Sequence, residues 1–301
     1  MKVRVGVGLG VRTCLNDAGF LDVADALERL KFDSLWLSER IGGEAPDPVV
    51  AMSMAAARTE KLKFGMSVMV LPGRNPVVLA KELATLDRMS NGRLLPAFGL
   101  GAVDAHEQQA FGVERATRAS IFDEALAVVR ACWTEESVDF SGTHYNYEGL
   151  RVRPKPVQSP PEVWLGGIAP SELRRVGRLA DGWLPSFVTP SDAADGWRAV
   201  NEVAAQHSRE IDPEHFGVLI PYTLDEPPAA LVAGLAARRP DLADPSVLVP
   251  RGWSGLVRAI EDFVSVGASK FVVVPIVEPQ NSSAWVDHLV DAADHLQPLQ
   301  T

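Results

Sequence analysis

The sequence is poor in cysteine, carries no excess of positive charge and has no long apolar run. Only Cys14 and Cys132 occur among its 301 residues, which fits a reducing cytoplasm with both thiols as packing residues. The formal net charge of −10 argues against non-specific binding to nucleic acid, because a phosphate backbone needs a basic surface. No apolar stretch approaches the roughly 20 residues of a membrane helix. No signal peptide is expected, since strand-like alternation follows directly after Met1 and Lys2.

The sequence also lacks the spacing of a metal site. Its six histidines show neither an HExxH motif nor another ligand pattern, so we expect no metal. The apolar fraction of 47% and the charged fraction of 23% are ordinary for a soluble protein. These properties predict a cytoplasmic protein without nucleic acid or membrane as a partner.

Strand-like and helix-like segments alternate along the chain. Strands are expected at residues 3–9, 33–37, 62–70, 94–98, 163–166, 182–185, 217–224 and 270–275. Helical periodicity separates them, for example at residues 20–30, 117–133, 191–207, 253–266 and 282–296. Eight such units predict an all-parallel α/β fold that closes into a (β/α)₈ TIM barrel. An open, doubly wound sheet is the alternative.

Two segments interrupt this alternation. Residues 136–161 contain an expected hairpin around 138–145 and then become rich in proline, and residues 225–252 carry one short helical stretch. We interpret both as insertions, after the fourth and the seventh βα units. Because no linker separates two halves of the chain, residues 1–301 are expected to form a single domain.

The most informative stretch is residues 71–101. Asn75 can cap a helix whose first residue is Pro76, and Asn91-Gly92 supplies a left-handed stop. The following short apolar run, residues 94–98, is typical of a strand that is covered on both faces. It ends in Gly99-Leu100-Gly101, and the carboxyl end of a strand is where parallel α/β folds bind ligands.

Several motifs, taken in order, resemble one known family. Besides residues 71–101 they are FDSLWLSER at 32–40, RPKPVQ at 153–158 and VWLGG at 163–167. Their order and spacing resemble the luciferase-like superfamily, (β/α)₈ oxidoreductases that use flavin or the deazaflavin coenzyme F420. The resemblance covers most of residues 1–190. It implies a redox cofactor at the carboxyl ends of the strands and a homodimer.

The best candidate for a phosphate site is the turn after the fifth strand. Gly166 and Gly167 let the backbone approach an anion, and the chain then passes through Ile168 and Ala169 into the start of a helix. Arg174 and Arg175 follow one turn later. Without the resemblance, a plain strand-to-helix turn explains this pattern equally well. The resemblance favours the phosphate of F420 or FMN.

Other cofactor residues come from the resemblance alone. In this superfamily, the position of Ser67-Val68 often carries a non-prolyl cis peptide that backs the ring, although a plain buried strand is the simpler interpretation of these residues. Ser38 belongs to the same region. Gly99 and Gly101 are expected to keep the end of the fourth strand low and leave room for a flat ring.

The candidate catalytic pair is Glu39-Arg40. Many F420 enzymes that resemble this chain have an acid followed by histidine here, but arginine stays charged and is no general base. Arg40 is instead expected to stabilise a reduced, anionic deazaflavin or to hold an acidic substrate. Glu39 is expected to bond to the ring or to take a proton. A surface ion pair is the alternative for both.

The residues after the fourth strand separate this chain from one branch of the superfamily. The sugar-phosphate dehydrogenases carry a glutamate just after the second glycine, where this chain has Ala102. This departure argues against sugar-phosphate oxidation. Asp104, His106 and Glu107 are expected near the pocket mouth. Arg74 is expected to be exposed, either to meet the cofactor's acidic tail or to stabilise its loop.

We expect an F420-dependent oxidoreductase that moves a hydride between the deazaflavin and a small organic substrate. An FMN-dependent two-component monooxygenase of the same superfamily is the first alternative. A non-catalytic flavin or deazaflavin carrier is the second. A metal-free hydrolase fits poorly, because no nucleophile with a partnered base is evident.

Overall fold

The computed structural model describes residues 1–301 apart from the side chain of Asp17. Its central strands are β1 (Arg4–Leu9), β2 (Ser34–Leu37), β3 (Lys63–Met66) with β4 (Met69–Val70), β5 (Leu94–Leu95) with β6 (Ala97–Gly99), β9 (Trp164–Leu165), β10 (Gly182–Trp183), β11 (Gly217–Tyr222) and β12 (Lys270–Pro275). The helices are α1 (Asp17–Arg29), α2 (Pro48–Arg58), α3 (Pro76–Met89), α4 (Ala105–Phe111), α5 (Arg118–Thr134), α6 (Pro170–Leu179), α7 (Pro190–Gln206), α8 (Ala229–Arg238), α9 (Gly252–Ser265) and α10 (Ser282–Leu296).

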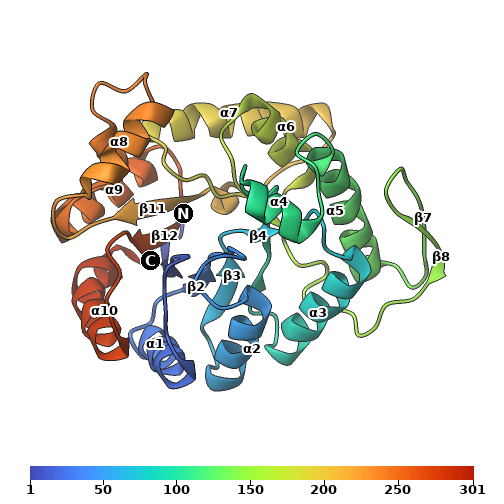
Figure 1. Ribbon diagram of the computed structural model, residues 1–301, viewed down its shortest axis with the longest axis horizontal. Helices are drawn as coiled ribbons and strands as arrows, with labels where there is room; N and C mark the ends of the chain where they lie inside the picture. Colours follow the sequence, from blue (N-terminus) through green and yellow to red (C-terminus); the bar gives the residue numbers. More distant parts are fainter.

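The strands form a closed ring with the helices outside it (Figure 1). One sheet has the order β11-β12-β1-β2-β3-β5 and the other β10-β9-β6-β4, and every ladder in them is parallel. On one side, β3 runs into β4 and β5 runs into β6. On the other side, parallel bridges from Trp183 to Phe216 and from Ser186 to Leu219 join β10 to β11. The expected parallel barrel is therefore confirmed, and the open sheet is excluded.

The structure differs from the sequence expectation in a few places. The third strand divides into β3 and β4 at Ser67-Val68, and the fourth divides at Pro96, which has no N–H to donate. Helix α4 was not expected, because its seven residues carry no apolar stripe. Cys14 is exposed, so its interpretation as a packing residue was wrong.

The two interrupting segments lie at different places in the βα units. The antiparallel hairpin of β7 (Val138–Ser141) and β8 (Asn146–Leu150) lies between α5 and β9, after the fourth unit. Helix α8 lies between β11 and α9, so this segment interrupts the seventh unit instead of following it. Among the described helices, none is long and apolar enough to cross a membrane.

Two tryptophans fill the inside of the barrel. Trp36 from β2 and Trp164 from β9 are buried there with Ala97, Leu184 and Val272. Neighbouring strands make room for the indoles by having no side chain. A Cβ added at Gly65 would lie 2.8 Å from Trp36 Cζ3, and one at Gly182 would lie 2.5 Å from Trp164 Cδ2. The interior is therefore packed side chains, as expected of this fold.

An ion cluster closes the opposite end of the barrel, where the strands begin. Lys270 Nζ lies 2.8 Å from Asp33 Oδ2, and Lys63 Nζ lies 3.1 Å from Asp33 Oδ1. Burial alone raises the pKa of Asp33, but the two ammonium groups outweigh it and hold that pKa well below its usual range. Since this end is closed, the carboxyl ends of the strands are the ones that can hold a ligand.

We predict that replacing Gly65 by alanine destabilises the protein by about 1–3 kcal/mol, because the new methyl group overpacks the interior against Trp36 and the carbonyl of Leu95. Gly234→Ala is the matched control. It lies inside α8 with no atom near its added Cβ, so it should be neutral or stabilise by about 0.5–1 kcal/mol. Urea unfolding of both variants measures this, and equal effects would contradict the packing argument.

Candidate active site

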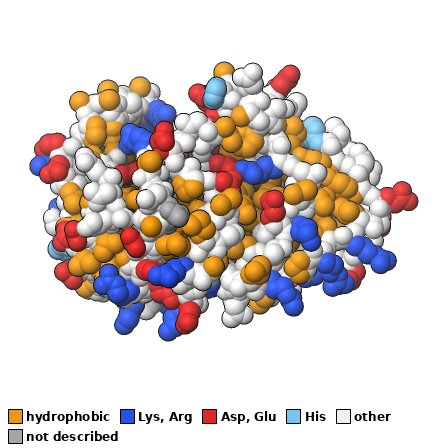
Figure 2. All heavy atoms as spheres, turned by 60° about the horizontal axis from the view of Figure 1, so that its bottom comes forward, with side chains coloured by type: hydrophobic (Ala, Val, Ile, Leu, Met, Phe, Trp, Pro, Cys, Tyr) orange, Lys and Arg blue, Asp and Glu red, His pale blue; other side chains and the backbone are white. Residues whose placement is uncertain are grey.

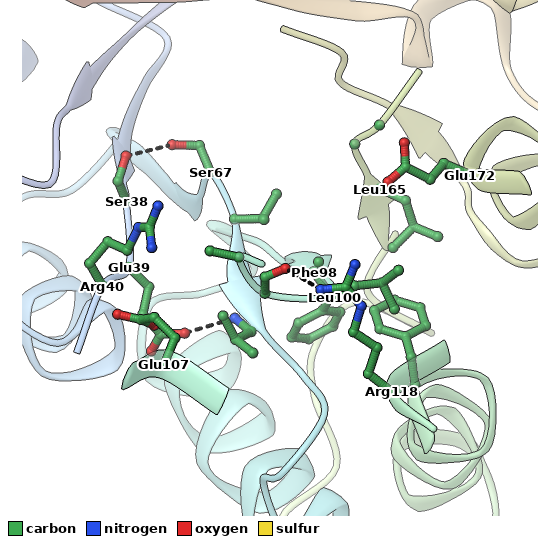
Figure 3. Close-up of a pocket in the computed structure, with 18 of the residues that line it drawn as sticks. Ser38, Glu39, Arg40, Ser67, Phe98, Leu100, Glu107, Arg118, Leu165 and Glu172 are labelled. Atoms are coloured by element: carbon green, nitrogen blue, oxygen red, sulfur yellow. Dashed lines mark hydrogen bonds between the residues drawn. The ribbon is translucent and has the colours of Figure 1, made fainter. Parts of the chain in front are cut away.

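A cavity of about 360 Å³ opens at the carboxyl ends of β2, β4, β6 and β9. The starts of α5 and α6 complete its wall. Most of the residues expected at the site lie around it (Figure 3): Ser38, Glu39, Arg40, Ser67, Val68, Gly99, Gly101, Gly166 and Gly167. Ile168 and Ala169 do not line the cavity; both are exposed. The strand-end rule thus brings together residues that are far apart in the sequence.

Two uncharged serines line the cavity just after β2 and β3. Ser38 Oγ and Ser67 Oγ are 3.5 Å apart, and the Ser67-Val68 peptide bond is cis. A Cβ at Gly99 would lie 2.5 Å from Val68 Cγ2, and one at Gly101 would lie 3.0 Å from Val70 Cγ1. These glycines therefore leave space for Val68 and Val70. Their effect on the space for a ligand is indirect, because it depends on where these valines lie.

Glu39 is hydrogen-bonded through both of its carboxylate oxygens. Its side chain is 4% exposed. Oε2 accepts a 2.7 Å hydrogen bond from the Val70 N–H, and Oε1 pairs with Arg74, whose Nε donates to the Val70 carbonyl. Burial raises the pKa of Glu39, while Arg74 and the Val70 N–H act in the opposite direction. The Glu39–Arg74 pair fixes β4 against β2. Arg74 therefore stabilises its loop, and it is half-buried, whereas the sequence predicted it to be exposed.

Glu107 is a second buried carboxylate at the cavity. It lies in the first turn of α4, is 5% exposed, and its Oε1 accepts a 3.0 Å hydrogen bond from the Ile41 N–H. Asp104 instead caps α4 by accepting from the N–H groups of His106 and Glu107. Of these three expected mouth residues, Glu107 is the one that lines the cavity.

Two arginines on the opposite wall complete the cavity. Arg118 Nη1 donates to the Gly101 carbonyl at 3.1 Å. Arg175 is paired with Asp123 at 2.7 Å and lies over the Phe122 ring. The sequence singled out Arg175 together with Arg174, which does not line the cavity, and it missed Arg118. The one signal for Arg118 was its place at the start of a helix after a glycine-rich strand end.

The expected phosphate turn contains a carboxylate of the protein itself. Glu172 Oε2 accepts hydrogen bonds from the N–H groups of Ile168 and Ala169, both at 3.0 Å. Gly167 has φ +96°, and a Cβ there would lie 2.6 Å from Glu172 Oε2. The two N–H groups expected to meet phosphate are thus satisfied by Glu172 in a capping interaction.

The fold and the cavity together define a parallel α/β-barrel protein with a cavity where barrel enzymes carry out their chemistry. The model of the luciferase-like monooxygenase family matches residues 11–263. The chain belongs to this family of oxidoreductases, which use F420 or a flavin, as the sequence motifs indicated.

Three known proteins illustrate the similarity. The F420-dependent glucose-6-phosphate dehydrogenase of Kineococcus radiotolerans is 31% identical over 173 residues, 54% of this chain and 50% of that protein. An F420-dependent secondary alcohol dehydrogenase in complex with an F420-acetone adduct superposes with a TM-score of 0.81 at 19% identity over the whole of both chains. The FMN-bound oxygenating constituent of 3,6-diketocamphane monooxygenase from Pseudomonas putida gives 0.78 at 15%, covering 99% of each chain. This chain spans about half the length of the curated relatives it matches.

We predict that Arg74→Gln costs about 3 kcal/mol or more of folding free energy, because it leaves the buried Glu39 carboxylate without its cation. Adding Glu39→Gln should recover part of this loss, since the double variant buries no unpaired charge. Urea unfolding of both single variants and the double variant gives the coupling energy. Additive effects of the two substitutions would contradict a structural ion pair.

Proposed function

We propose that the protein is an F420-dependent oxidoreductase that transfers a hydride between the deazaflavin and a small organic substrate. The observation that carries this proposal is the cavity at the strand ends. The uncharged side chains of Ser38 and Ser67 line one side of it, and the Gly166-Gly167 turn lines the other. Its volume of about 360 Å³ lies within the range of small-molecule sites. The curated relatives of about 30% identity include F420-dependent dehydrogenases by name.

The residues present fit a cofactor with a flat ring and a phosphorylated arm. Ser38, Ser67 and Val68 would face the ring, and Gly99 and Gly101 lie beside them. Gly166 and Gly167 would approach the phosphate. Arg118 uses one N–H for the Gly101 carbonyl and has others left for an anion. For phosphate to reach the N–H groups of Ile168 and Ala169, the Glu172 side chain would have to turn away, since two anions cannot share these donors.

The deazaflavin would supply or accept the hydride, and the chain's own residues would orient the reactants and keep water out. Val68, Val70, Phe98, Leu100 and Leu165 give the cavity apolar walls. Glu39 positions β4 and does not transfer a proton in this proposal, because both its oxygens are engaged. Ala102 lines the cavity where the sugar-phosphate dehydrogenases have a glutamate, so we propose a substrate other than a sugar phosphate.

An FMN-dependent monooxygenase is the second candidate. The same glycine turn and Arg118 would serve the phosphate of FMN, and the FMN-bound camphane enzyme shares the fold. A non-catalytic carrier is the third, because Arg40 is no general base and both oxygens of Glu39 are hydrogen-bonded. Cofactor binding and turnover, measured separately, distinguish the three.

We predict that the purified protein binds F420 more tightly than FMN in fluorescence titrations. Arg118→Gln should weaken binding of F420 by about tenfold or more, because a charge-assisted hydrogen bond to the anion is lost. Arg198→Gln is the matched control: it removes the same charge from an exposed position on α7 and should change nothing. Tight FMN binding without F420 affinity would favour the monooxygenase, and binding without turnover the carrier.

We also propose that residues 1–301 are one barrel domain, with the β7–β8 hairpin and α8 as insertions, and that the protein is a homodimer. Supporting the dimer is an apolar groove of about 530 Å³ between α2 and α3. Val50, Val78 and Met89 on these helices are 60%, 52% and 81% exposed. Figure 2 turns this side of the molecule forward and shows apolar side chains gathered among charged ones. A second copy presenting the same groove would bury both.

We predict that light scattering after size exclusion gives a dimeric mass for the unchanged protein and a monomeric one for Met89→Glu. A buried charge at the centre of an apolar interface carries a large desolvation cost. Val290→Glu on α10 replaces another exposed apolar residue and should leave the dimer intact. A dimer that survives Met89→Glu would place the interface elsewhere.

A further inference from the structure

We propose that Arg40 binds a carboxylate of the substrate, so that the protein acts on small organic acids. This inference rests on the proposed function and names its substrate class. The observation behind it is an exposed arginine at the cavity whose backbone is held in place, while its guanidinium makes no hydrogen bond or ion pair among the described residues.

The backbone on both sides of Arg40 is fixed by buried carboxylates. On one side, Glu39 is held by Arg74 and by the Val70 N–H. On the other side, the Ile41 N–H donates to Glu107 Oε1. The Arg40 carbonyl accepts from the Gly43 N–H at 3.1 Å, and a Cβ at Gly43 would lie 3.0 Å from Arg40 Cβ. The backbone of Arg40 is therefore fixed, whereas its guanidinium makes no hydrogen bond among the described residues.

The three carboxylates that line the cavity already have hydrogen-bond donors. Glu39, Glu107 and Glu172 each accept from backbone N–H groups. Arg175 pairs with Asp123, which also binds Arg178. Asp104 lies within electrostatic reach of Arg40, but it caps α4, and among the described side chains no ion pair joins the two. In a chain of net charge −10, Arg40 is an exposed cation at the edge of the cavity whose N–H groups can bind an anionic ligand.

The position of Arg40 separates it from the phosphate turn. Figure 3 shows Arg40 and Ser38 on one wall of the cavity and Leu165, Glu172 and Arg118 on the opposite wall. Arg118 and the Gly166-Gly167 turn are on the side proposed for the phosphate. Arg40 follows Ser38 by two residues, at most roughly 7 Å of chain. It therefore lies close to the ring's proposed seat, on the wall opposite the phosphate turn.

An arginine at this point suits recognition and not proton transfer. Its guanidinium stays charged at every working pH, and its N–H groups form a planar fork that matches a carboxylate with two parallel hydrogen bonds. Arg40 would orient a substrate acid over the ring while the apolar walls hold the rest of the molecule. The chemical step itself stays the hydride transfer already proposed.

The test uses the protein loaded with F420 and titrated calorimetrically with acetate, benzoate and succinate, each against its neutral amide. At least one acid should bind about tenfold or more tightly than its amide, as expected for a charge-assisted pair. Arg40→Gln should abolish this preference while leaving the dissociation constant of F420 within twofold. Arg40→Lys should restore part of it, and Arg198→Gln on the surface should retain all of it.

Three outcomes would overturn the inference. The acids and amides bind alike, or Arg40→Gln leaves the preference intact, or Arg40→Gln weakens F420 binding instead, which would assign Arg40 to the cofactor. The F420 titration reports separately on the proposed function. If FMN alone binds, the same acids and amides are titrated onto the FMN-loaded protein; if neither cofactor binds, both proposals fail.

Discussion

Two tryptophan side chains that pack against glycines of neighbouring strands fill the barrel interior, and they leave the carboxyl ends of the strands for a cavity. Trp36 and Trp164 occupy the interior because Gly6 and Gly65 flank the first and Gly182 the second. Below them, Lys270 and Asp33 close the strand beginnings. With the lower interior filled and sealed, the carboxyl ends of the strands are where the cavity opens, which is why residues from β2, β4, β6 and β9 meet there.

A second constraint works at the level of a single strand. The third strand stops at Met66 and resumes at Met69, and the resumed part is held by Glu39, which reaches across from the end of β2 to the Val70 N–H. Arg74 neutralises the carboxylate and bonds to the Val70 carbonyl. A buried acid at a cavity therefore serves the shape of the cavity. Its raised pKa reflects burial, which occurs in structural ion pairs as well as in catalytic sites.

The sequence predicted best what depends on local periodicity and capping. The strand 270–275 and the helix 282–296 have the predicted bounds, and Asn75 caps α3 as expected. Helix α4 escaped prediction, because its buried member is a glutamate and not an apolar stripe. The strand-end rule together with the family resemblance predicted most of the candidates that line the cavity, but not Arg118 or Glu172, which come from the starts of helices.

What the sequence did not predict is which charges in the cavity are already satisfied. The sequence shows four charged residues at the cavity but not their partners. In the structure, backbone N–H groups donate to Glu39, Glu107 and Glu172, whereas Arg40 has no such partner among the described residues. Those N–H groups belong to β4, to the turn after β2 and to the start of α6, and their geometry arises only in the folded chain. The three glutamates and three arginines that line the cavity balance in number. Where an anion can bind therefore depends on which donors stay open, as those of the exposed Arg40 guanidinium do among the described residues, and not on an excess of charge.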